Sequence, residues 1–146
     1  MEKNEMTVLL IEPEEHPKVV TIGTGLEALQ KAVDGWIEAV YPFEDPVALI
    51  VNEEGKLNHL PPNRALRHKD GEIYDIIAGN MLVVGLGEED FTSLSPKLMA
   101  KYKEYFHHPE VFFHIGRKVV AVPLPDNVTD GVSIEMKPLR KREPER

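Results

Sequence analysis

The chain has no cysteine, and this absence excludes several kinds of chemistry at once. Thiol nucleophiles, disulfide bonds and zinc sites built on thiolates cannot occur. The absence also fits a reducing compartment, and we expect a soluble, cytoplasmic protein. Long apolar runs are missing too, because the longest candidates, residues 47–51 and 81–86, fall far below the roughly 20 residues that span a bilayer. The N-terminal residues show neither a basic leader nor a cleavage-like site, so we expect no signal peptide and no membrane association.

Basic residues are scarce outside the C-terminal end. Residues 1–136 hold 12 Lys or Arg against 23 Asp or Glu, whereas residues 137–146 carry a local charge of +3. An acidic body repels phosphates, so we expect no general nucleic-acid binding by it. Two interpretations of the acidic surface are open. It confers solubility, or it is an acidic decoy that occupies the DNA-binding site of another protein.

Motifs of catalysis and metal binding are absent as well. The chain has no G-x-S-x-G or S-x-x-K arrangement, and paired carboxylates carry little information in so acidic a sequence. The six histidines do not show zinc spacing, because His107 and His108 are adjacent and His114 lies beyond a proline. The alternative is that His107 and His108 end a helix, where the helix dipole stabilises a protonated imidazole. The sequence therefore predicts no enzyme activity, no metal and no cofactor.

The apolar runs in the sequence follow the pattern of a single α+β domain. The length of 146 residues fits a single domain, which we place at residues 1–125. We predict that residues 126–146 form a mostly disordered tail, basic from Lys137. Apolar or branched runs predict strands at 6–11, 18–22, 36–41, 47–51, 56–60, 81–86, 111–115 and 118–124, and the apolar run 74–77 is left open.

Turn residues group these strands into hairpins. We expect strand 6–11 to pair with 18–22, and 111–115 with 118–124. Strand 47–51 is expected to pair with 56–60 around the turn NEEG, where Gly55 would supply a positive φ.

Two helices are predicted between the strands. One covers residues 26–33 with Thr24 as cap, and the other begins at Pro96 with Ser93 or Ser95 as cap. Residues 63–67 are expected to form one short helical turn. The resulting architecture is a twisted, mainly antiparallel sheet of five to seven strands with both helices packed on one face, similar to a β-grasp roll.

Two long segments together carry a family resemblance. They read WIEAVYPFEDPVALIVNEEGKLNHLPPNRAL and then GEIYDIIAGNMLVVGLGEEDFTSLS. The two segments in this order resemble the bacterial, plasmid and phage family called domain of unknown function 3846. The likeness covers about residues 6–105, and residues 111–124 depart from the family as an added hairpin. The resemblance implies residence in mobile genetic elements or their hosts, and it supplies no catalytic residues.

The segment 61–67 is the candidate ligand site. Its prolines restrict the backbone, Asn63 can donate and accept hydrogen bonds, and Arg64 and Arg67 carry planar groups suited to carboxylate or phosphate. The other candidate residues, expected nearby across the predicted hairpin, are Asn52, Glu53 and Tyr41. Together they would frame a small pocket for an anionic ligand. The alternative is structural: Asn63 caps the turn, and the arginines pair with Asp70, Glu72 or Asp75.

These features favour a non-enzymatic binding or adaptor protein of a mobile genetic element, such as an anti-defence protein that acts by stoichiometric binding. Its partner would be a host protein, blocked by the acidic decoy, or a small anionic ligand that the pocket sequesters. One alternative is an enzyme that acts on nucleotides. Another is a structural, homo-oligomeric subunit with Trp36, Phe112 and Phe113 in the seam between copies.

Overall fold

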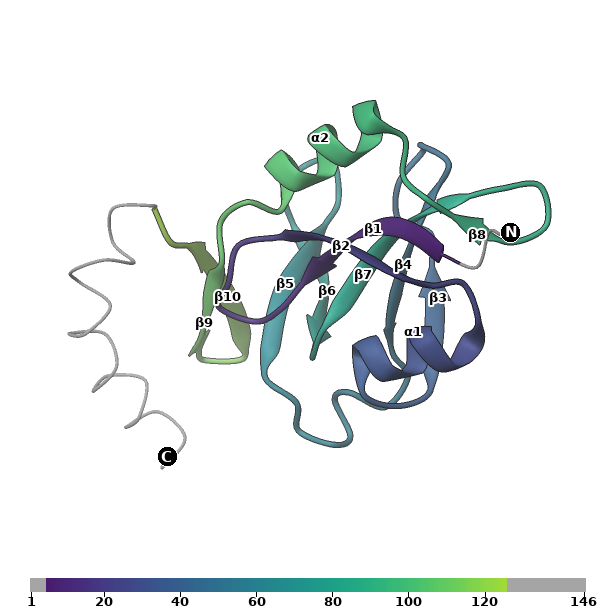
Figure 1. Ribbon diagram of the computed structural model, residues 1–146. Coiled ribbons are helices and arrows are strands. Elements are labelled where there is room, and N and C mark those ends of the chain that lie inside the picture. Colours follow the sequence, from purple (N-terminus) through teal and green to yellow (C-terminus); the bar gives the residue numbers. More distant parts are fainter. Residues whose placement is uncertain (1–4, 126–146) are drawn as a thin grey trace.

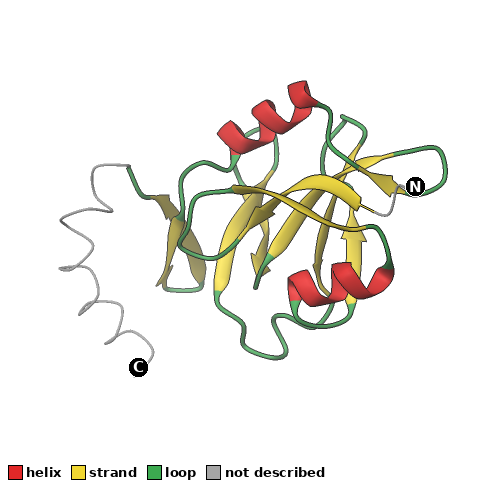
Figure 2. Ribbon diagram, viewed as in Figure 1, coloured by secondary structure: helices red, strands yellow, loops and turns green. Residues whose placement is uncertain are grey.

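The computed structural model describes residues 5–125, and Figure 1 shows their arrangement. The predicted tail 126–146, with its basic end from residue 137, lies outside the described residues. Two helices and antiparallel sheets make up the described part, which confirms the α+β class (Figure 2). No helix within residues 5–125 is long and apolar enough to cross a membrane.

An antiparallel sheet forms the centre of the fold, in the order β2-β1-β7-β4-β3, with the short β8 paired to β7. The bounds are β1 (Glu5–Ile11), β2 (Lys18–Gly23), β3 (Ile37–Val40), β4 (Val47–Asn52), β7 (Met81–Leu86) and β8 (Phe91–Thr92). The predicted antiparallel sheet and the predicted β1–β2 hairpin are thereby confirmed. A β-grasp roll has a parallel pair at its centre. Here β1 pairs antiparallel with both neighbours, so the strand arrangement differs from that expectation.

The two helices cover opposite faces of this sheet, so the prediction that both pack on one face is wrong (Figure 1). Helix α1 (Leu26–Val33) packs on the face formed by even-numbered residues such as Ala48 and Leu82. Helix α2 (Pro96–Tyr105) packs on the face formed by odd-numbered residues such as Leu49 and Val83. The reason is that the central strands are apolar on both faces, and each face requires a cover.

Ser95 caps α2 as predicted, since its side chain accepts a hydrogen bond from the Leu98 amide at 3.2 Å. The N-cap of α1 is Gly25 without a side-chain hydrogen bond, so the expected cap at Thr24 is wrong.

Two small hairpins extend the fold. Strands β5 (Pro62–Arg67) and β6 (Ile73–Ala78) form one, and β9 (Glu110–Ile115) and β10 (Lys118–Pro123) form the other. The second confirms the predicted C-terminal hairpin. The helical turn expected at residues 63–67 is wrong because this segment is strand β5, and a proline is tolerated at the first residue of a strand. The core takes Leu66 and Ile77 from the first hairpin.

The predicted pairing of residues 47–51 with 56–60 is also wrong. Both edges of β4 are occupied, by β3 and β7, and residues 53–59 form turns instead of a second strand. Gly55 is needed there for a different reason from the expected positive φ. A Cβ at Gly55 would lie 2.6 Å from the carbonyl oxygen of Ala78, so the close approach of this loop to β6 requires glycine.

Candidate functional site

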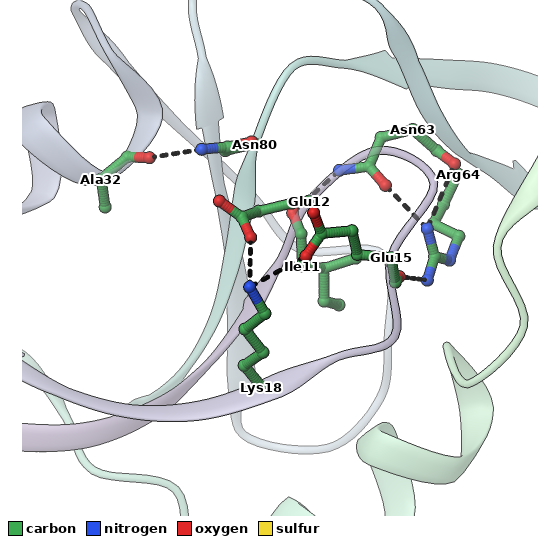
Figure 3. Close-up of polar contacts among 8 residues, drawn as sticks. All are labelled: Ile11, Glu12, Glu15, Lys18, Ala32, Asn63, Arg64 and Asn80. Atoms are coloured by element: carbon green, nitrogen blue, oxygen red, sulfur yellow. Dashed lines mark hydrogen bonds and ion pairs between the residues drawn. The ribbon is translucent and has the colours of Figure 1, made fainter.

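Arg64 is a buried structural residue and not part of an open pocket. It is 2% exposed, and its guanidinium donates to three parts of the chain. Nε and Nη2 donate to the Phe106 carbonyl at 3.1 and 2.8 Å. Nη2 also donates to the Glu15 carbonyl at 2.8 Å, and Nη1 donates to Asn63 Oδ1 at 2.9 Å (Figure 3). Burial lowers the pKa of Arg64 to about 10, and the nearby Glu110 partly opposes this effect. Arg64 therefore fastens the end of α2 and the β1–β2 turn to β5.

Asn63 is buried beside it and is likewise fully engaged. Its Nδ2 donates to the carbonyl oxygens of Ile11 at 2.9 Å and Gly79 at 2.8 Å. The amide thus joins β5 to the end of β1 and to the β6–β7 turn. Neither Asn63 nor Arg64 presents a free polar group to solvent.

The other predicted residues lie elsewhere. Asn52 donates through Nδ2 to the carbonyls of Val33 at 3.0 Å and Asp34 at 3.1 Å, which fixes the end of α1. Glu53 is exposed and, together with Asn52, lines a small hollow of about 150 Å³ that also contains Glu38, Glu54, Asp75 and Lys56. Four carboxylates against one lysine disfavour an anion there. Tyr41 is 60% exposed and does not line this hollow. The six predicted residues therefore do not form one pocket.

Arg67 is the predicted residue that lines the two larger hollows of the surface. Its Nη1 lies 3.0 Å from Oε2 of Glu110, while Oε1 of Glu110 accepts the Ala65 amide at 2.8 Å. In the described part of the chain, neither Arg64 nor Arg67 forms the alternative ion pair with Asp70, Glu72 or Asp75. Asp75 pairs with Lys56 instead. Glu110, which the sequence analysis did not single out, thereby attaches the β9–β10 hairpin to β5.

A large groove separates the two hairpins, and we call it the hairpin groove. Its volume is about 1280 Å³. The apolar lining includes Leu60, Ile73, Ile76, Ala78, Val119 and Ala121. The polar lining includes Lys56, His59, Arg67, Tyr74, His114 and Lys118, together with Glu72 and Asp75. Apolar walls with polar groups at the rim are typical of a binding site.

A second hollow, of about 510 Å³, lies on the other side of Arg67 and Tyr74, and we call it the aromatic hollow. Its lining includes Phe43, Tyr102, Tyr105, Lys69 and Lys101. Asp45 accepts hydrogen bonds from Lys101 at 2.6 Å and from the Tyr102 hydroxyl at 2.7 Å, and these contacts hold its pKa below the usual value. Burial, and then the Asp45 carboxylate, raise the pKa of Tyr102.

Within residues 5–125, no three His, Asp or Glu side chains come together as a possible metal site. The residues proposed for an oligomer seam are far apart. Trp36 is 65% exposed and precedes β3, whereas Phe112 and Phe113 belong to β9, and Figure 1 shows these strands at opposite ends of the molecule. They do not share one surface.

The comparisons with known proteins agree with the resemblance seen in the sequence. A family model described as Domain of unknown function (DUF3846) matches residues 6–107. No curated protein and no solved structure matches the chain. Strand β10 lies beyond the matched residues, so one wall of the hairpin groove is not part of the family match.

Proposed function

The chain belongs to the family of Domain of unknown function 3846, and on that premise we propose that it is a binding protein whose ligand occupies the hairpin groove. The observation that carries the proposal is the groove itself, about 1280 Å³ with apolar walls supplied by two hairpins. A protein of this kind acts by stoichiometry and needs no catalytic residues. Such action suits an adaptor or anti-defence protein of a mobile genetic element.

The groove differs from the rest of the surface in its charge. The polar lining mixes Lys56, Arg67 and Lys118 with two carboxylates, whereas the body as a whole is strongly acidic. The groove therefore repels an acidic ligand less than the surrounding surface does. A protein partner and a small anionic ligand both remain within the proposal.

Capture from the cells that produce the protein tests this function. Wild type, Ile76→Arg and Trp36→Arg would be isolated under native conditions, and the bound molecules identified by native mass spectrometry. Ile76 lines the groove, and Trp36 is an exposed apolar residue outside it. We expect a ligand, protein or small molecule, that wild type and Trp36→Arg retain and Ile76→Arg loses.

Two outcomes would contradict the proposal. One is a ligand that Trp36→Arg loses and Ile76→Arg keeps. The other is no ligand on any of the three proteins. Circular dichroism of Ile76→Arg controls for unfolding, and Val120→Glu on the opposite wall provides a second groove variant. An acidic decoy, by contrast, would lose its partner with added salt and not with Ile76→Arg.

A second candidate function is turnover of a nucleotide, and the aromatic hollow favours it. Tyr74 and Tyr105 are about half exposed there, at 47% and 52%, and can stack on a base. Arg67 and Lys69 line the same hollow and can contact phosphate. Incubation of the purified protein with a nucleotide panel, followed by chromatography of the products, tests this candidate; unchanged nucleotides would remove it.

A further inference from the structure

Among residues 5–125, β10 pairs with β9 alone, and no strand pairs with the outer edge of β10. The hairpin turns at Gly116, whose φ is +63°, and places Ile115 opposite Lys118. In such a two-residue hairpin the flanking residues exchange both hydrogen bonds, and bonded pairs then alternate with unbonded ones. The N–H and C=O groups of Val119 and Ala121 therefore point away from β9.

This outer edge borders the hairpin groove. The lining includes residues 118–121 of β10 without a gap. A strand that turned only one face to the groove would contribute alternate residues, because successive side chains point to opposite faces. The uninterrupted run means that the backbone edge of β10 forms part of the groove wall.

The edges of β6 and β10 are not equivalent. On β6 the Asp75 carboxylate accepts the Ile76 amide at 2.8 Å and also pairs with Lys56, so the Ile76 amide already has an acceptor. On β10 residues 119–122 are all apolar, and Val122 is 41% exposed. Natural edge strands are usually protected by charges or by a covering element. The centre of β10 has neither within the described residues.

We propose that the hairpin groove binds an extended polypeptide segment of a partner protein, which pairs with the outer edge of β10 as an added strand. This inference rests on the proposed function and specifies the ligand. Main-chain hydrogen bonds to Val119 and Ala121 hold the segment, and its alternate apolar side chains face Ile76 and Ala78 across the groove. The volume of about 1280 Å³ exceeds the roughly 300–1,000 Å³ of small-molecule sites, which favours a polypeptide.

The test uses peptides selected from a random displayed library on the wild-type protein. We expect selected sequences with apolar residues at alternate positions. Val119→Pro removes the outward amide but no β9 hydrogen bond, and proline is tolerated at such an edge position. Because one hydrogen bond is lost, the affinity of a selected peptide should fall roughly threefold to tenfold in fluorescence anisotropy. Val119→Thr keeps the amide and is the matched control, for which we expect little change.

A peptide N-methylated at alternate residues gives the same test on the unaltered protein, so the inference does not depend on the folding of Val119→Pro. One alternating set of N-methyl groups should abolish binding, and the other should not. Equal binding of both sets, or failure to select any peptide, would overturn strand addition. If cellular capture still depends on Ile76 while these tests fail, strand addition is wrong and the groove function stands. Loss of dependence on Ile76 would defeat both.

Discussion

Replacement of Arg64 by methionine distinguishes a structural arginine from a ligand-binding one. The guanidinium donates to Phe106, Glu15 and Asn63, and charge-assisted hydrogen bonds contribute about 1.5–3 kcal/mol each. Against this stands the cost of keeping the buried group charged. Burial lowers its pKa from the usual arginine value to about 10, which corresponds to about 3 kcal/mol. We therefore expect Arg64→Met to lower the free energy of unfolding by roughly 3 kcal/mol.

Urea unfolding followed by circular dichroism measures this change, with Arg67→Met as the comparison. Arg67 makes a single ion pair, in which its own side chain is 30% exposed and that of Glu110 is 9% exposed. Its loss leaves a buried carboxylate with one partner fewer and should cost about 1–3 kcal/mol. A selected peptide should bind Arg64→Met as it binds wild type, but Arg67→Met less tightly. An Arg64→Met protein of undiminished stability that no longer binds the peptide would refute this assignment of roles.

Three further changes probe the fold that supports the groove. The difference in free energy of unfolding between wild type and Asp45→Asn should shrink as the pH falls below about 4. The reason is that the lowered pKa of Asp45 stabilises the folded state only while the carboxylate is charged. Urea unfolding at several pH values checks this. Gly85→Ala places a Cβ 2.4 Å from the Ser93 carbonyl oxygen and should cost about 1–3 kcal/mol, measured by thermal unfolding. Glu110→Gln should keep an acceptor for the Ala65 amide, whereas Glu110→Ala should cost about 2 kcal/mol more and speed proteolysis of the β9–β10 hairpin.

Local signals in the sequence were sufficient for individual elements. Proline at position 96 behind Ser95 predicts the start of α2, and short apolar runs between turn residues predict most strands. The positions of the helices required a further step. Residues 47–51 and 81–84 are apolar without alternation, which indicates strands buried on both faces and hence helices on two faces. The pairing of β4 with β7 joins segments far apart in the chain, and no turn residue marks it.

The candidate site was harder to predict for a related reason. Asn63 and Arg64 stand out in the sequence because they are polar, yet their partners are backbone carbonyls, which every residue has. Phe106, which Arg64 contacts, is 42 residues away. The hairpin groove likewise depends on Glu110, whose carboxylate joins two hairpins and looks ordinary in an acidic chain. Arg67 lines the hairpin groove and the aromatic hollow, and its contact with a ligand stays a prediction.

Amide hydrogen exchange along β10 tests the central claim most directly. In the free protein, the outward amides of Val119 and Ala121 should exchange faster than those of Val120 and Val122, which pair with β9. Addition of a selected peptide should slow exchange at Val119 and Ala121. Unchanged exchange along β10, with protection appearing elsewhere on the molecule, would contradict the addition of a strand to β10.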